Sequence, residues 1–324
     1  MRAVVFTGAG GNEVVQVVDR PDPVPGPEEV LVAARFAGLN PADLEQRAGR
    51  YQAPPGNPPD HPGLEVAGTV IAAGQRVTTW REGDRVFGLV AAGGLADQVA
   101  VHERCVAKIP DTLSDRDSAA VPEAFITAHD AVVTQANLRL GESLLVHGAA
   151  GGVGSAAVQI GVRAGARVLA TVRSERSRHA VEVLGAEVSD DASFPAAVRD
   201  ATAPRGVDVI LELVGAHHLP GDLEVLAPCG RIAVVGVGAG HEAALDLRAL
   251  MVRRATIFGT VLRSRPLEQK AAAVRAFERE VVPGLGLGAI RPLVESVIPV
   301  EDIHGAFDRL AAPGKVGKVL VDFG

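Results

Sequence analysis

The sequence predicts an α/β protein in which a doubly wound parallel sheet is inserted into a β-rich domain. Short valine-rich runs fill the first third of the chain, strand and helix patterns alternate after about Pro122, and the tail returns to β character. Many short strands with turn signals are typical of a barrel or sandwich, whereas alternating strands and helices are typical of βαβ units. We therefore expect one domain from residues 1–121 and 286–324, and a second from 122–285.

The β-rich region is divided by clusters of Gly, Pro and Asp, most clearly at the prolines 21, 23, 25 and 27. A single helix is expected at Pro41–Ala48, where proline occupies the first turn. The runs that predict strands are Arg2–Thr7, Glu13–Val18, Glu28–Phe36, Glu65–Ala73, Asp84–Val90 and Leu95–Val101.

The alternating region begins with a short apolar strand and a helix that ends before Gly165, a residue type common at helix ends. The expected strands are Ser143–His147, Arg167–Arg173, Val207–Val214, Arg231–Val237 and Ala255–Leu262. The expected helices are Gly152–Ala164, Glu175–Leu184 and Pro266–Val281. In the tail, strands at Val294–Val300 and Lys315–Phe323 flank a helix at Glu301–Ala311.

Composition excludes several classes of protein. The 324 residues are 47% hydrophobic and 22% charged, which is average for a globular chain. A net charge of −7 and only 3% aromatic residues argue against a nucleic-acid surface. The two cysteines, Cys105 and Cys229, are too few for a disulfide framework. With no apolar run of about 18 residues and no signal-peptide pattern at the start, we expect a cytoplasmic protein with no membrane or nucleic-acid partner.

A glycine-rich turn joins the first strand and helix of the alternating region. It reads Gly148-Ala-Ala-Gly151-Gly152-Val153-Gly154. Glycine allows a tight turn and a close approach of the backbone to a pyrophosphate, and the helix start offers unpaired N–H groups to the phosphates. Because a strand precedes this turn and a helix follows it, the motif predicts dinucleotide binding.

The end of the next strand bears on the choice of dinucleotide. An acidic residue about 20 positions after the glycines would bind the ribose 2′-hydroxyl of NAD, but Val172 occupies that region. Arginine and serine side chains that follow suit a 2′-phosphate, which favours NADP, although Glu175 counts against it and a merely solvated helix start is the alternative. The candidate residues are Arg173, Ser174, Arg176 and Arg178.

Other catalytic patterns are absent. The chain has no Cys-x-x-Cys, no His-x-x-x-His and no Gly-x-Ser-x-Gly motif, so neither a metal site nor a hydrolase is supported. Adjacent His217 and His218 should diverge, and we expect a solvated pair rather than metal ligands.

Several further motifs, in order along nearly the whole chain, resemble those of the medium-chain dehydrogenase/reductase superfamily. The chain is most similar to the zeta-crystallin-like quinone oxidoreductases, in the branch of the tumour-suppressor-inducible enzyme. These motifs are Gly38-Leu-Asn-Pro-Ala-Asp43, Arg47-Ala-Gly-Arg-Tyr51, Pro62-Gly-Leu-Glu-Val-Ala-Gly68, Gly83-Asp-Arg-Val86, Pro122-Glu-Ala-Phe-Ile-Thr-Ala128, the glycine turn, Leu262-Arg-Ser-Arg265 and Gly317-Lys-Val-Leu320.

The resemblance implies a GroES-like domain split by a Rossmann domain, with NADPH in the cleft between them and a quinone as acceptor. Zinc-dependent members of the superfamily carry cysteine where this chain has Asn40, and histidine where it has Leu64. A catalytic zinc needs about three protein ligands, so the resemblance implies a zinc-independent reductase.

The resemblance also implies roles for individual residues. Asn40 would lie beside the nicotinamide ribose, and Tyr51 would donate a hydrogen bond to the acceptor oxygen, unless it merely covers the cofactor. Gly151 stands where the narrower branch often has serine, which leaves a serine-assisted proton step in doubt. A strand near Thr256–Leu262 would join two copies into a homodimer. Further cofactor contacts are expected at Thr127, Gly236, Val261, Leu262 and Arg263.

Two other functions stay open at this stage. An NADPH-dependent 2-alkenal or enoyl reductase would use the same cofactor and differ mainly in the shape of its acceptor. A non-catalytic NADPH-binding or RNA-binding protein is the alternative from another class, although the charge and the scarcity of aromatic residues count against RNA.

Overall fold

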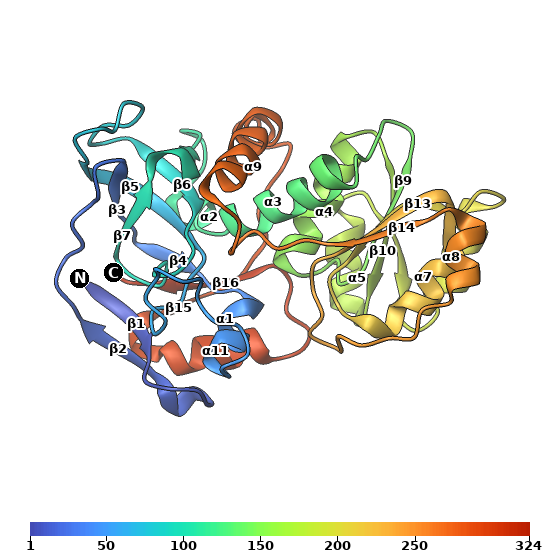
Figure 1. The fold of residues 1–324 in the computed structure, drawn as a ribbon, viewed down its shortest axis with the longest axis horizontal. Coiled ribbons are helices and arrows are strands. Elements are labelled where there is room, and N and C mark those ends of the chain that lie inside the picture. Colours follow the sequence, from blue (N-terminus) through green and yellow to red (C-terminus); the bar gives the residue numbers. More distant parts are fainter. The chain divides into compact units, whose positions relative to one another are not determined.

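The computed structural model describes residues 1–324 and contains two compact units (Figure 1). The first unit comprises Met1–Ile126 and Leu262–Gly324, and the second comprises Thr127–Val261. These divisions differ from the expected ones because residues 122–126 and 262–285 lie in the first unit. There α9 (Leu267–Glu280) packs on the β-rich part, with the rings of Phe277 and Phe87 centred 5.6 Å apart.

The first unit contains three sheets. A five-stranded antiparallel sheet has the order β7-β3-β5-β6-β8, a three-stranded sheet has the order β15-β16-β4, and β1 pairs with β2. The strands are β1 (Arg2–Phe6), β2 (Val15–Asp19), β3 (Glu29–Ala33), β4 (Phe36–Gly38), β5 (Glu65–Ala73), β6 (Arg85–Leu89), β7 (Gln98–His102), β8 (Val106–Lys108), β15 (Val294–Pro299) and β16 (Lys318–Asp322).

The helices of this unit lie between and after these strands. The α-helices are α1 (Pro41–Arg47), α2 (Asp115–Ser118), the start of α3 (Pro122–His129), α9, α10 (Val282–Gly286) and α11 (Ile303–Ala311). Short 3₁₀ turns are η1 (Asn12–Val14), η2 (Glu103–Cys105) and η5 (Val300–Asp302).

One strand expected in this unit is wrong in its extent. The run Glu28–Phe36 was expected to form a single strand, but the chain leaves the five-stranded sheet after Ala33. The next segment, β4, pairs with β16 in another sheet. A continuous apolar run does not reveal this break, because both halves are suited to strands.

The second unit is a six-stranded parallel sheet with the order β11-β10-β9-β12-β13-β14. The central strands are buried and rich in Val, Ile and Leu, as expected of strands covered on both faces. Its strands are β9 (Ser143–Val146), β10 (Arg167–Val172), β11 (Glu187–Asp190), β12 (Val207–Glu212), β13 (Leu226–Val234) and β14 (Thr256–Gly259).

The helices of the second unit connect these parallel strands, as the crossovers of a doubly wound sheet require. They are α4 (Gly152–Arg163), α5 (Glu175–Glu182), α6 (Phe194–Thr202), α7 (Leu219–Val225) and α8 (Leu247–Arg253), with a π-helical segment η3 (Asp130–Gln135) and a 3₁₀ turn η4 (Ala216–His218). The predicted fold class, a doubly wound parallel sheet inserted in a β-rich domain, is confirmed. No helix of the chain combines the length and the apolar character needed to cross a bilayer.

Candidate active site

The glycine turn lies between β9 and α4, at the carboxyl edge of the parallel sheet. Gly148 has φ +64°, which favours glycine. A Cβ on Gly154 would lie 2.7 Å from Ala149 Cα and closer still to the Gly148 carbonyl, so only glycine fits there. No side chain caps α4, whose N-cap is Gly151, so its first N–H groups can serve a phosphate.

The arginines expected at a 2′-phosphate differ in their surroundings. Arg178 is held by the Val188 carbonyl and by Asp190, both 2.7 Å away, so its guanidinium is already engaged. Ser174 caps α5 by accepting the N–H of Ser177. Arg173 is exposed and has no carboxylate partner, which makes it the most available of the three arginines.

Other residues expected at the cofactor are divided between the two units. In the second unit, the Thr127 hydroxyl is buried without a partner, and a Cβ on Gly236 would collide with the backbone of Leu213. Val261 ends the second unit and is half exposed. Leu262 and Arg263 are buried in the first unit.

A buried ammonium group organises the polar core of the first unit. Lys318 Nζ of β16 lies 2.5 Å from both Asn40 Oδ1 and Glu65 Oε1. Asn40 Nδ2 also donates to Glu65 Oε1 at 2.8 Å. All three side chains are at least 95% buried, so the Lys318 charge is compensated locally by Glu65.

Two more carboxyl groups adjoin this centre. Asp43 of α1 accepts the N–H groups of Asn40 at 2.8 Å and Gly63 at 3.1 Å. Burial raises the pKa of Asp43 to about 6, although these two hydrogen bonds act to lower it. Glu123, in the first turn of α3, donates its backbone N–H to Glu65 Oε2 at 2.9 Å. Burial, and then the charge of Glu65, raise the pKa of the Glu123 carboxyl to about 8.

Tyr51 lies beneath a guanidinium group of the same unit. Arg263 donates to Gln46 Oε1 at 2.6 Å, to the Ala91 carbonyl at 2.7 Å and to the Tyr51 carbonyl at 3.2 Å. Its Cζ also lies 4.9 Å from the centre of the Tyr51 ring. Arg263 therefore holds the Tyr51 loop in place. Its guanidinium was expected to contact the cofactor, but it is engaged in these bonds within the first unit. The Tyr51 hydroxyl has no hydrogen-bond partner and is available to a ligand.

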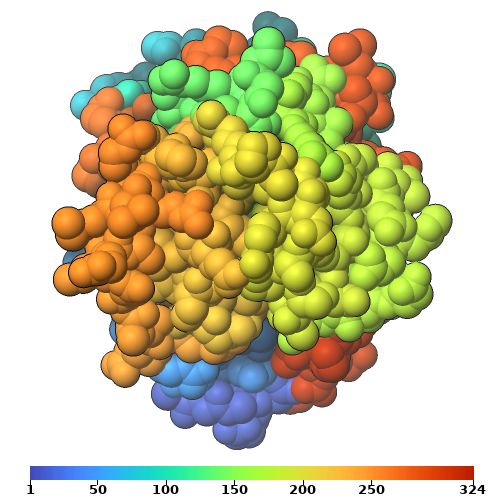
Figure 2. All heavy atoms as spheres, turned by 90° about the vertical axis from the view of Figure 1, so that its right-hand side faces the viewer, coloured from blue at the N-terminus to red at the C-terminus, as the bar shows by residue number.

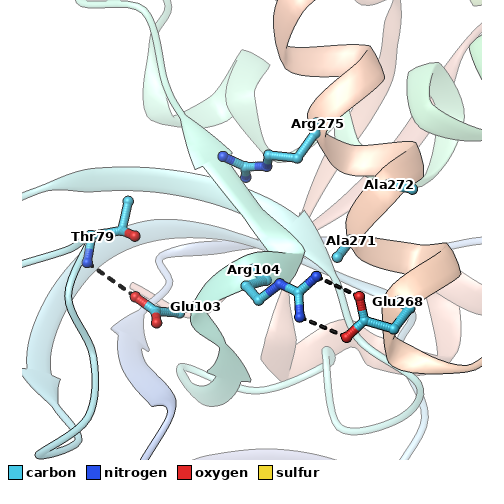
Figure 3. A pocket seen from close by; sticks show the side chains of 7 residues that line it. All are labelled: Thr79, Glu103, Arg104, Glu268, Ala271, Ala272 and Arg275. Atoms are coloured by element: carbon cyan, nitrogen blue, oxygen red, sulfur yellow. Dashed lines mark hydrogen bonds and ion pairs between the residues drawn. The ribbon is translucent and has the colours of Figure 1, made fainter.

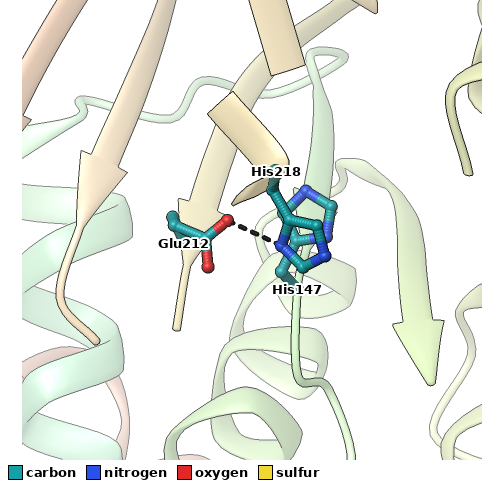
Figure 4. A group of neighbouring side chains, drawn as sticks. All are labelled: His147, Glu212 and His218. Atoms are coloured by element: carbon teal, nitrogen blue, oxygen red, sulfur yellow. Dashed lines mark hydrogen bonds and ion pairs between the residues drawn. The ribbon is translucent and has the colours of Figure 1, made fainter. Parts of the chain in front are cut away.

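A histidine cluster lies next to the glycine turn in the second unit (Figure 4). His147 Nε2 is 2.8 Å from Asp222 Oδ1, and His218 is 2.9 Å from Glu212 and 3.1 Å from Asp191. Burial lowers the pKa of His218, but these carboxylates outweigh it and the pKa is raised. The expectation of a solvated His217-His218 pair is therefore wrong for His218, which is buried.

The same cluster brings possible metal ligands together, but its ring nitrogens are already engaged. Ligand atoms of His147, Glu212 and His218 lie within 4.8 Å of one another, and the two histidine rings are stacked with centres 4.1 Å apart and planes 24° apart. Each of these nitrogens already faces a carboxylate or the Thr171 hydroxyl. We interpret the cluster as an ion-pair network that supports the end of β9, directly before Gly148.

A hollow of about 290 Å³ lies in the first unit, between α9 and the segments around η2 (Figure 3). Its charged groups already have partners. Arg104 forms two 2.7 Å bonds with Glu268, and Glu103 accepts the N–H groups of Thr78 and Thr79. This hollow is therefore a weaker candidate for a substrate site than the surroundings of Tyr51.

Sequence reasoning missed the roles of Lys318, Glu65, Glu123 and Gln46, although the first three lie in motifs that resemble the family. A signal was available for two of them. Lys318 and Glu65 each begin a strand that is mostly apolar, where a buried charged residue needs a partner. For Gln46 and Glu123 we find no comparable signal, because each lies on a helix where polar residues are ordinary.

The fold and the glycine turn define a class of nucleotide-dependent oxidoreductases, and the comparisons with known proteins agree. Residues 26–111 match the alcohol dehydrogenase GroES-like domain, and residues 152–279 match the zinc-binding dehydrogenase domain. The chain is 34% identical to quinone oxidoreductase of Lama guanicoe and 32% identical to that of Homo sapiens, in each case over 99% of this chain and 97% of the relative. It therefore belongs to the medium-chain dehydrogenase/reductase superfamily, and it is an oxidoreductase enzyme.

Solved structures show the same fold. An NAD-dependent alcohol dehydrogenase is 31% identical with a TM-score of 0.88, and each chain is fully covered. A mycobacterial protein in complex with NADPH is 29% identical with a TM-score of 0.88, covering 99% of this chain and all of the other. The CurK enoyl reductase is 28% identical with a TM-score of 0.88, covering 99% of this chain and 98% of the other.

Proposed function

We propose that this enzyme is a zinc-independent reductase that transfers hydride from NADPH to a quinone. The observation that carries the proposal is the Lys318 ammonium, which lies 2.5 Å from Asn40 Oδ1 and Glu65 Oε1. By the resemblance, zinc-dependent members of the superfamily carry a metal ligand at the position of Asn40. In this chain the Lys318 ammonium already compensates the oxygen atoms of Asn40 and Glu65 there. An acceptor that takes hydride without a Lewis acid suits such a site, and quinones are of this kind.

The residues present do not fit a catalytic zinc ion, despite the name of the matching domain family. Zinc needs about three nitrogen, sulfur or oxygen ligands from the protein. Leu64 is apolar and buried, and the amide of Asn40 is bonded at both ends. We therefore assign no step to a metal.

The second unit fits a dinucleotide. The glycine backbone at Gly148 and Gly154, the uncapped start of α4 and the unpartnered Thr127 hydroxyl all suit a phosphate-bearing ligand. NADPH, when bound, supplies the hydride. Arg173 and Arg176 would hold its 2′-phosphate. The NADPH complex of the mycobacterial protein offers a precedent for this cofactor in the fold.

Tyr51 is the group we assign to the acceptor oxygen. Hydride addition leaves negative charge on that oxygen, and a hydroxyl donor stabilises the charge as it develops. Burial and the nearby Glu123 charge raise the pKa of Tyr51, so its hydroxyl keeps its proton at neutral pH. The Asn40 amide is hydrogen-bonded to both Lys318 and Glu65. We expect it to lie beside the nicotinamide ribose.

Reduction of an activated C=C bond is the second candidate, and the similarity to the CurK enoyl reductase favours it. The same donor and the same nucleotide would serve an enone. A purely RNA-binding role has less support, because the net charge of −7 disfavours a phosphate backbone.

The test is the oxidation of NADPH and of NADH with an ortho-quinone, a para-quinone, a 2-alkenal and no acceptor. We expect turnover with NADPH and a quinone, and little with NADH or the alkenal. Preference for the alkenal would instead support the enoyl reductase. NADPH binding without any turnover would support a binding protein.

We also propose a homodimer formed at the edge strand β14. This strand has a partner on one side only, and the neighbouring α8 exposes Leu247, Met251 and Val252. The segment that contains α8 belongs to the orange region of Figure 2. An open strand edge beside exposed apolar side chains is typical of an interface. Light scattering on the purified protein should give twice the chain mass of 33.4 kDa.

A further inference from the structure

Arg263 is a buried cation that no carboxylate compensates. The residue is 6% exposed, and its three hydrogen bonds all go to neutral oxygen atoms of other residues. It forms no ion pair, whereas the buried Lys318 ammonium has Glu65 at 2.5 Å. Burying a charge without an opposite charge is costly, so the positive charge of Arg263 points to a role beyond packing.

The hydrogen bonds of this guanidinium join three segments of the first unit. Gln46 lies in the last turn of α1, Tyr51 lies in the loop of residues 48–64 that follows it, and Ala91 follows β6. Gln46 is itself buried, and its Nε2 donates to the Pro59 carbonyl at 3.0 Å. One amide therefore holds both the guanidinium and a later part of the Tyr51 loop. All of these residues belong to the first unit, so the arrangement does not depend on the second.

The guanidinium lies against the ring that carries the free hydroxyl. Arg263 Cζ is 4.9 Å from the centre of the Tyr51 ring, within the range of a cation–π contact. Burial lowers the pKa of Arg263, but a guanidinium keeps its proton at neutral pH. The charge of Arg263 acts to lower the pKa of Tyr51, against burial and the charge of Glu123, which raise it. A phenol beside a positive charge is also a stronger hydrogen-bond donor.

We propose that Arg263 and Gln46 are positioning residues for Tyr51: Gln46 holds the guanidinium, and the guanidinium fixes the Tyr51 ring and strengthens its hydroxyl as a donor to the acceptor oxygen. The inference rests on the proposed function for the role of that hydroxyl. Negative charge develops on the acceptor oxygen as hydride arrives, so a stronger and better fixed donor stabilises the transition state. This role replaces the contact with the cofactor that was expected for Arg263.

The first test needs neither cofactor nor acceptor. Tyr51 is the only tyrosine in the chain, so phenolate absorbance after a rapid jump to alkaline pH reports this residue alone. Arg263→Met removes the charge, and the ionisation midpoint of Tyr51 should move to higher pH. Gln46→Glu keeps an acceptor for the guanidinium but compensates its charge, and should shift the midpoint in the same direction. The control is Arg81→Met, whose side chain is 90% exposed, and it should leave the midpoint unchanged.

The direction of this shift separates the proposal from a purely structural role. If Arg263 only packed the loop, its loss would expose the phenol, and the midpoint would fall towards the usual value of 10. An unchanged or lowered midpoint in Arg263→Met would therefore overturn the inference, whether or not the enzyme reduces quinones.

The second test is fluorescence titration with NADPH. Because the guanidinium is engaged within the first unit, Arg263→Met should leave the Kd for NADPH nearly unchanged. A loss of affinity of about tenfold or more, as expected when a charge-assisted hydrogen bond to the ligand is removed, would show that Arg263 contacts the cofactor and would overturn the inference.

The third test is a double-mutant cycle in quinone reduction. Arg263→Met and Gln46→Met should each lower kcat about tenfold with little change in the KM for NADPH, and Arg263→Lys, which keeps the charge, should partly restore kcat. In Tyr51→Phe, which lacks the hydroxyl, the same changes should cost little more, because they act through that hydroxyl. Equal losses with and without the hydroxyl would overturn the inference. Absence of turnover in the native enzyme would contradict the proposed function, while the Tyr51 midpoint and the NADPH titration would still decide the role of Arg263.

Discussion

Single charged residues decide which ligands this chain can hold. Arg178 resembles a phosphate ligand in the sequence, but in the structure Asp190 and the Val188 carbonyl hold its guanidinium. Arg173 has no such partner. In the first unit, Lys318 compensates Glu65 within a buried site, where an unpaired charge would be costly. The difference between an available arginine and an engaged one is thus set by the neighbours that the fold places beside each side chain.

Replacing Arg173 and Arg176 together by alanine should weaken NADPH binding about tenfold to a hundredfold and leave NADH binding nearly unchanged. A charge-assisted bond to phosphate contributes about 1.5–3 kcal/mol, and NADH lacks the 2′-phosphate. Fluorescence titration with both cofactors measures this. Arg163→Ala, at an exposed position at the end of α4, is the matched control. Equal losses for both cofactors would refute the phosphate assignment.

At the scale of elements, the turn between β9 and α4 depends on one close approach. Gly154→Ala places a methyl group 2.7 Å from Ala149 Cα, whereas a Cβ at Gly151 finds its nearest neighbour 3.5 Å away. We expect Gly154→Ala to cost about 1–3 kcal/mol in unfolding free energy and at least about tenfold in NADPH affinity. Gly151→Ser should be tolerated, since serine is a good N-cap. Thermal melts and cofactor titration would contradict this account if both variants behaved alike.

Helices and strands could be predicted from the sequence where a local pattern determines their bounds. They could not be predicted where the bounds depend on pairing with a segment that is distant in the sequence. The range of β5 was predicted correctly, as was the start of α4 after the glycine turn. The break between β3 and β4 was missed, because it depends on pairing with β16, nearly 300 residues further along the chain. His218 was misjudged because Asp191, just after β11, and Glu212, at the end of β12, form ion pairs with it in the folded chain. The buried contacts of Lys318 with Asn40 and Glu65 are likewise long-range.

At the scale of the whole molecule, the two units divide the proposed work between them. The second unit offers the turn that suits a dinucleotide, and the first holds Tyr51, Glu123 and the Lys318 centre. The chain thus retains the fold of the zinc-binding dehydrogenase family but not a set of zinc ligands. The central claim is that hydride transfer here proceeds without a metal ion.

The most direct test measures NADPH oxidation with a quinone on protein whose zinc content has been determined. We predict well under one zinc ion per chain, and a rate that neither a strong chelator nor added zinc changes. A variant that removes the ammonium, Lys318→Met, provides a further check. It should not create a requirement for zinc, because Leu64 still provides no ligand. Turnover that scales with zinc content, or that a chelator abolishes and zinc restores, would contradict the account.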